Sequence, residues 1–148
     1  MNRLVLASLV ALSLSCTAKE TPEAQIRKVL DEGAAALEAQ DAPRAADTLA
    51  DGYQDAAGRT KDKLKGLAFF ALQQGPLLVS MQSVDIKVNG DKATVTMKVL
   101  AIQGSPALKT ARDLLPTNAR SFDLALTMIK DGAWRVAAID GLSGLGTE

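Results

Sequence analysis

The sequence contains no histidine and a single cysteine, Cys16. Without histidine there is no imidazole for general acid–base catalysis, for Ser-His or Cys-His nucleophile pairs, or for metal ligation. A single cysteine cannot form an internal disulfide. Because these absences remove many common catalytic and metal sites, we expect neither a cofactor nor a bound metal.

Aromatic residues are also scarce: Tyr53, Phe69, Phe70, Phe122 and Trp134. The hydrophobic fraction is nevertheless 47%, so a core of mainly aliphatic side chains and methionine is predicted. Neither sign of charge is in excess, with 17 basic and 17 acidic residues. A chain without an excess of basic residues lacks the positive charge that binds nucleic-acid phosphates, which argues against nucleic acid as a partner.

The N-terminus begins with a short positive stretch that ends at Arg3, followed by an uncharged apolar run, Leu4–Leu14. A transmembrane helix needs about 20 apolar residues, so this run is too short to span a bilayer. It has the size of a signal-peptide core. The 148 residues therefore predict one domain behind a leader.

The leader ends in Ser13-Leu14-Ser15 directly before Cys16. This arrangement resembles the lipobox of bacterial lipoproteins, in which the signal peptide is cut just before a diacylglyceryl-cysteine. The resemblance implies a signal peptide over 1–15 and a lipidated Cys16, carrying acyl chains such as palmitate, at the start of a linker over 16–21. Ordinary secretion with cleavage after Ala18 is the alternative.

Acyl chains on Cys16 would make the membrane a partner of the protein, since each buried methylene contributes about 0.8 kcal/mol. Thr17 follows the cysteine, where an aspartate would favour retention at the inner membrane. We therefore expect the protein in the bacterial cell envelope, anchored at the outer membrane and facing the periplasm.

Three helices are predicted after the linker. Thr21-Pro22-Glu23 combines an N-cap hydroxyl, a first-turn proline and an acid, and an apolar stripe runs from Ile26 to Leu37. Asp41-Ala42-Pro43 starts a shorter helix to about Leu49, and Thr60 caps a third that ends near Gln73. Gly52–Asp55 is predicted as a brief strand.

The period then changes from helical to two, which predicts antiparallel strands. Asn89-Gly90 and Asp131-Gly132 are strong hairpin-turn signals. The expected strands cover Leu77–Val88, Lys92–Ile102, Ala119–Lys130 and Ala133–Gly141. A short helix, Pro106–Leu115, is expected between the second and third strands as a cover for the core, and the C-terminal tail is expected to fray.

Helices followed by a four-stranded sheet give an α+β domain with helices packed on one face of a curved antiparallel sheet. Trp134, Val136 and Ala138 share one phase and are expected to face inward. That phase leaves several apolar residues on the outer face: Leu100, Ala125, Ile129, Ala137 and Ile139. This face would either be buried in a homodimer or carry isolated exposed apolar side chains.

The order of elements resembles the nuclear transport factor 2-like superfamily, the cone-shaped fold of ketosteroid isomerases. Four segments carry the resemblance: Glu38–Asp41, Leu49–Asp55, Gly58–Asp62 and Lys130–Val136. The resemblance covers about residues 22–141 of a domain assigned to 22–148. It implies a pocket between the helices and the concave sheet, suited to a small apolar ligand.

Within this resemblance Asp55 falls where the isomerases keep a proton-transferring carboxylate, and an apolar cone would raise its pKa. The positions of the isomerases' two oxyanion donors hold Gly33 and Ala125, so the catalytic set is incomplete. The alternative is that Asp55 is a turn acid before Ala56. Tyr53, two residues from Asp55, is either a pocket residue or a core residue with its hydroxyl at the rim.

Asp140 shares the phase of Trp134, so it would point into the mouth of the cone or, as a strand-end acid, into solvent. Tyr53, Asp55 and Asp140 are the candidate ligand-binding residues. The favoured interpretation is a membrane-anchored, non-enzymatic protein that binds a small apolar ligand or a protein partner. An isomerase or lyase that uses Asp55 as general base is the second hypothesis, and a cone filled by its own side chains the third.

Overall fold

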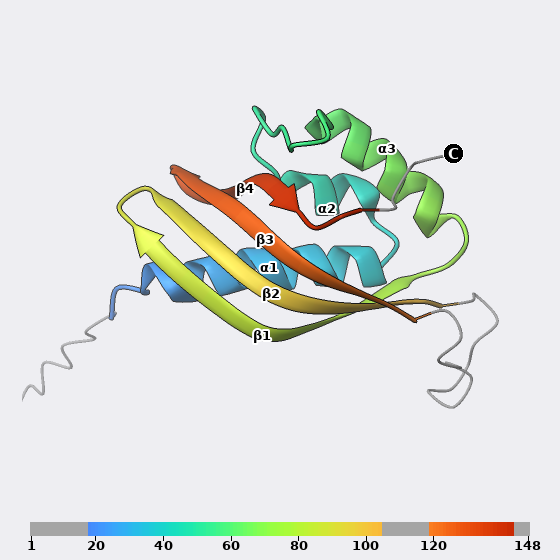
Figure 1. Ribbon diagram of the computed structural model, residues 1–148, viewed down its shortest axis with the longest axis horizontal. Coiled ribbons are helices and arrows are strands. Elements are labelled where there is room, and N and C mark those ends of the chain that lie inside the picture. The colour runs from blue at the N-terminus through green and yellow to red at the C-terminus, as the bar shows by residue number, and fades with distance from the viewer. Residues whose placement is uncertain (1–17, 105–118, 144–148) are drawn as a thin grey trace, which may run out of the picture.

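The structure, a computed structural model, describes residues 18–104 and 119–143. Its elements are α1 (Pro22–Glu38), α2 (Ala42–Asp47), α3 (Lys61–Leu72), β1 (Leu77–Asn89), β2 (Lys92–Gln103), β3 (Ala119–Asp131) and β4 (Ala133–Asp140). The strands form one antiparallel sheet in the order β1-β2-β3-β4. Helix α1 crosses one face of this bent sheet, and α3 packs on α2 (Figure 1). The predicted α+β fold is confirmed.

Each helix begins at the cap that the sequence predicts. The Thr21 hydroxyl accepts a hydrogen bond from the backbone N–H of Ala24 at 3.2 Å, and Asp41 accepts one from Arg44 N–H at 3.0 Å. The hydroxyl of Thr60 does the same for the first turn of α3. These bonds satisfy N–H groups that have no partner within the helix, which fixes where each helix starts.

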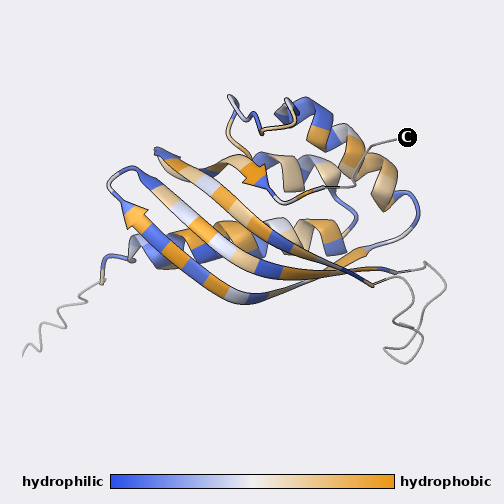
Figure 2. Cartoon of the chain, in the orientation of Figure 1, coloured by the Kyte–Doolittle hydropathy of each residue, from blue (hydrophilic) through white to orange (hydrophobic). Residues whose placement is uncertain are grey.

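The core lies between α1 and the inner face of the sheet. Tyr53 and Trp134, the largest buried side chains, are each 2% exposed. The buried cluster comprises Ile26, Leu30, Leu49, Tyr53, Ala93, Val95, Leu126, Met128, Trp134 and Val136. Hydrophobic and hydrophilic residues alternate along the strands, as Figure 2 shows, because one face of the sheet covers this core.

Strand β1 contains a bulge that the sequence pattern does not predict. The register with β2 shifts between Gln82 and Asp85, and Ser83 has a positive φ of 51°. Met81 and Val84 both pack against the core although they are three residues apart. The extra residue thus keeps the apolar side chains inward on both sides of the bend.

A second bulge lies in β4. Thr127 pairs with Ala138 whereas Met128 pairs with Val136, which leaves Ala137 as the extra residue. Beyond it the alternation is inverted. Our predictions that Ala138 faces inward and Ile139 outward are therefore wrong, since Ile139 pairs with Leu126 and packs against the core.

The predicted strand Gly52–Asp55 does not form. Within 49–55 there are only two isolated bridges, from Leu49 to Val136 and from Gln54 to Thr60. The backbone of this segment runs instead along the edge of β4, where Ala50 N–H donates to Val136 O at 2.8 Å and Gln54 N–H donates to Ala137 O at 3.1 Å. Because Tyr53 N–H turns back to Ala50 O at 3.0 Å, the chain cannot continue as an extended strand. The segment covers an edge that would otherwise expose unpaired backbone groups.

Several predicted features lie outside the described residues: the signal peptide, Cys16, the helix Pro106–Leu115 and the end of the C-terminal tail. Among the residues that are described, no helix combines the length and apolarity needed to cross a bilayer.

We expect Gly141→Ala to destabilise the fold at the end of β4. Gly141 has a φ of +97°, and a Cβ there would overlap the backbone carbonyl oxygen of Asp123. Such strain costs about 1–3 kcal/mol. Urea unfolding followed by the fluorescence of Trp134, the chain's one tryptophan, measures this change.

Gly66→Ala is the matched control for Gly141→Ala. Gly66 lies inside α3, and an added Cβ meets nothing within 4 Å. Alanine in a helix interior is favoured over glycine by about 0.8–1 kcal/mol, so this variant should be more stable than the wild type. Equal unfolding midpoints for Gly141→Ala and the wild type would contradict the close approach.

Candidate functional site

The most organised polar site in the described chain is centred on Asp55, just after the segment that covers β4. Its Oδ1 accepts from the backbone N–H groups of Ala57 and Arg59, both at 3.0 Å. Its Oδ2 accepts from the Arg59 Nε at 2.7 Å and from the Tyr53 hydroxyl at 3.3 Å. Four donors thus converge on one carboxylate whose side chain is 1% exposed.

The two bonds to Oδ1 form because the chain turns tightly after Asp55. Gly58, with a φ of 70°, donates its N–H to Asp55 O at 2.9 Å, and Asp55 N–H donates to Arg59 O at 3.2 Å. An aspartate side chain that binds N–H groups a few residues ahead is a common turn stabiliser. This geometry is the one expected of a turn acid.

Our expectation of a raised pKa for Asp55 is wrong. Burial alone acts to raise the pKa, but the hydrogen bonds and charge of Arg59 and the N–H of Ala57 outweigh it and hold the pKa of Asp55 below its ordinary value. Since a general base near neutral pH needs a pKa close to the working pH, a strongly ionised carboxylate is a weak base for proton transfer.

Tyr53 shares this polar cluster, and its hydroxyl has two partners. It donates to Asp55 and accepts from the backbone N–H of Ile139 at 3.2 Å. Burial, together with the neighbouring Asp55 charge, raises the pKa of Tyr53 to about 12. The phenol therefore stays protonated at physiological pH and ties the Asp55 turn to β4.

Arg59 completes the cluster and extends it to the C-terminal segment. Its guanidinium lies against Asp55, and its Nη1 also donates to the carbonyl of Leu142 at 3.4 Å. Asp55 and Arg59 are only four residues apart in sequence, but Arg59 also connects the cluster to the segment that follows β4. Sequence reasoning did not single out Arg59; opposite charges four residues apart around Gly58 were the available signal.

The structure does not bring the three candidate ligand residues into one site. Tyr53 and Asp55 are buried together, whereas Asp140 is exposed beside Ala125, beyond the bulge in β4. Asp140 and Ala125 therefore occupy the outer face of the sheet. The position that the isomerase resemblance assigns to a second oxyanion donor, Ala125, does not line the interior.

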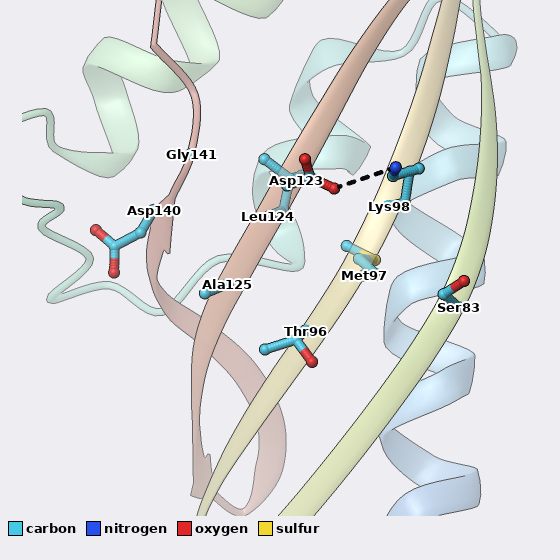
Figure 3. A pocket seen from close by; sticks show the side chains of 9 residues that line it. All are labelled: Ser83, Thr96, Met97, Lys98, Asp123, Leu124, Ala125, Asp140 and Gly141. Carbon is cyan, nitrogen blue, oxygen red and sulfur yellow. Dashed lines mark ion pairs between the residues drawn. The ribbon is translucent and has the colours of Figure 1, made fainter.

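A hollow formed by described residues lies on this outer face, turned away from α1 (Figure 3). It has a volume of about 450 Å³ and is widely open to solvent. Its lining crosses the sheet from β1 to β4 and includes Ser83, Thr96, Lys98, Asp123, Ala125 and Asp140. We call this hollow the sheet groove.

Charges of both signs stand on the sheet groove. Lys98 Nζ lies 3.8 Å from Asp123 Oδ1, and both side chains are more than half exposed. Asp140 adds a second carboxylate on the neighbouring strand. In the described parts of the chain, no three acidic or cysteine side chains gather as a metal site would require. The groove offers hydroxyls, one cation and two anions around a largely apolar floor.

We expect Asp55→Asn to destabilise the protein by about 3 kcal/mol, because it breaks the buried ion pair between Asp55 and Arg59. The amide oxygen can still accept from the turn, so the loss reports mainly on the ion pair. Urea unfolding at neutral pH measures it. Asp51→Asn, which breaks an exposed pair with Lys61, is the matched control and should change stability little.

The same pair predicts how stability changes with pH. Because folding lowers the pKa of Asp55, the stabilisation is complete above the ordinary carboxyl value of 3.8 and is lost as the pH falls through the lowered folded value. The stability difference between wild type and Asp55→Asn should therefore shrink in acid. A difference that stays constant down to pH 2 would contradict an ionised Asp55.

No known family profile and no curated protein matches the sequence. Solved structures do match in fold. One is a nuclear transport factor 2-like protein from Cytophaga hutchinsonii, at 15% identity over 81% of this chain and 96% of that chain, with a TM-score of 0.61. Another is a protein with a cystatin-like fold from Nostoc punctiforme, at 17% identity over 82% and 91%, with a TM-score of 0.61.

A third match is Aln2 from a Streptomyces species, at 10% identity over 81% of this chain and 90% of that chain, with a TM-score of 0.65. At these identities the likeness concerns the fold alone. The chain therefore has the nuclear transport factor 2-like, cystatin-like fold.

Proposed function

We propose that this protein is a bacterial envelope lipoprotein, tethered through an acylated Cys16, whose domain binds a protein partner and does not catalyse a reaction. The observation that carries the non-enzymatic part is the state of Asp55. Its carboxylate has four donors, a lowered pKa and an arginine in contact. Those bonds stabilise the turn around Asp55 and its contacts with Tyr53 and Arg59.

The packing of the interior favours a protein partner over a small apolar ligand. Tyr53 and Trp134 are fully buried between α1 and the sheet, where a ligand of the cone would have to lie. The sheet groove is open instead, and its polar rim suits the mixed contacts of a protein surface. The partner would therefore dock on the outer face of the sheet.

A second copy of the chain is one form this partner can take. Leu100, Ala125 and Ile129 are half-buried on the outer face, and Ala125 also lines the sheet groove. A homodimer through this face would cover them and pair charges of opposite sign across a two-fold axis.

The alternative function, an isomerase or lyase with Asp55 as general base, lacks support from the site. Substrate would have to displace Arg59 or the Tyr53 hydroxyl from Oδ2 before the carboxylate could take a proton. The cost of breaking the buried ion pair with Arg59 would oppose that step.

Cys16→Ser should release the protein from the membrane fraction, because the thiol that would carry the acyl chains is gone. Fractionation of cells and intact-mass analysis of the purified N-terminus measure the two consequences. Thr17→Ala, which leaves the cysteine in place, is the control and should remain in membranes with its lipid mass. An unmodified N-terminus in the wild type would refute the tether.

A photo-crosslinking residue at Thr96, inside the sheet groove, should give a protein adduct in cells. The matched position is Glu32, an exposed residue of α1 on the opposite side of the sheet. Lys98→Glu in the groove should reduce the Thr96 adduct, since it reverses the cation there. Adducts are resolved by mass spectrometry of the crosslinked bands, which also identifies a second copy of this chain.

Two results would overturn docking on the groove. One is equal crosslinking from Thr96 and Glu32. The other comes from native mass spectrometry of protein purified from its own envelope: a retained small-molecule mass would return the binding site to the interior of the cone.

A further inference from the structure

The two large hydrophobic side chains that the described chain leaves exposed both lie on α3. Phe69 is 54% exposed and Phe70 is 68% exposed, although the sequence has only five aromatic residues. Their rings meet edge to face with centroids 6.3 Å apart. Exposing large aromatic side chains is costly, so a pair of them marks a contact surface.

The N-terminal half of α3 is rich in lysine. Lys63 and Lys65 are exposed on α3, and Asp62 is the one acidic residue of that helix. Lys61 is already paired with Asp51 at 2.9 Å. The helix thus runs from a basic, hydrophilic start to a hydrophobic end (Figure 2).

We propose that the outer face of α3, formed by Phe69, Phe70, Lys63 and Lys65, rests on a bilayer that contains anionic lipids. Aromatic side chains insert at the boundary between headgroups and acyl chains, while lysine ammonium groups contact the phosphates.

The choice of a bilayer as the occupant rests in part on the tether proposed above. Residues 17–21 separate Cys16 from α1 and span at most about 18 Å when fully extended. A domain held this close to lipid meets the bilayer at high effective concentration. Helix α3 lies toward the opposite end of the long axis from the start of α1 (Figure 1), so both contacts together lay the domain along the membrane.

The test uses the full chain with Cys16→Ser, which cannot be acylated, so that binding reports on the α3 face alone. Its sedimentation with vesicles of phosphatidylglycerol and phosphatidylcholine is compared with that of the same chain carrying Phe69→Ser and Phe70→Ser. The partition coefficient should fall at least about tenfold in the double variant. It should also fall for Lys63→Gln with Lys65→Gln, and for pure phosphatidylcholine vesicles.

Phe69→Leu with Phe70→Leu is the conservative control and should retain most of the binding. Because both rings are exposed, all variants should unfold near the wild-type midpoint, which Trp134 fluorescence verifies. Equal sedimentation of the serine variant, or no sedimentation of either chain, would overturn the proposal. So would a concentration-dependent dimer that the serine substitutions abolish, since the occupant would then be a second copy.

This outcome is separable from that of the tether. Vesicle binding that depends on the phenylalanines, together with an unmodified N-terminus in cells, would refute the lipid anchor and keep the α3 contact. A lipidated N-terminus without phenylalanine-dependent binding would support the lipid anchor and refute the α3 contact.

Discussion

The convergence of four donors on the Asp55 carboxylate holds together parts of the chain that are far apart in sequence. Through Tyr53 it reaches β4 at Ile139, and through Arg59 it reaches the carbonyl of Leu142. The segment along the edge of β4 and the tight turn before α3 are fixed by the same group. The carboxylate can remain charged in this buried position because it is paired with Arg59 and accepts hydrogen bonds at both oxygens. With these bonds in place, the pKa of Asp55 stays below its ordinary value.

Features that depend on a few neighbouring residues could be predicted from the sequence. The caps at Thr21, Asp41 and Thr60, and the hairpins at Asn89-Gly90 and Asp131-Gly132, each arise from local side-chain or backbone preferences. The alternation of apolar residues also predicts which side chains of a strand face the core, as far as the first bulge in that strand. These features are enough to specify the α+β fold.

The two bulges could not be predicted in this way. Ser83 adopts a positive φ although it is not a glycine. The extra residue in β4 is Ala137, and alanine is not a residue type that indicates a bulge. Each bulge forms because the bent sheet must keep apolar side chains on the core, a requirement of the whole structure. The one in β4 inverts the side-chain alternation, which is why Asp140 lies outside, away from Tyr53 and Asp55. A candidate site assembled from strand phase fails wherever such a bulge intervenes.

The aromatic residues of the domain divide between its core and its surface. With few aromatic residues, the chain places Tyr53 and Trp134 between α1 and the sheet and leaves Phe69 and Phe70 outside. The sheet groove and the α3 face belong to different layers, since one lies on the face turned from α1 and the other on the outermost helix (Figures 1 and 3). If both proposals hold, a domain that rests on lipid through α3 keeps the groove clear of the bilayer. The tether and the α3 face would then set the orientation in which a partner meets the groove. Anchoring and binding would thus be functions of separate surfaces, which lets a substitution remove one and spare the other.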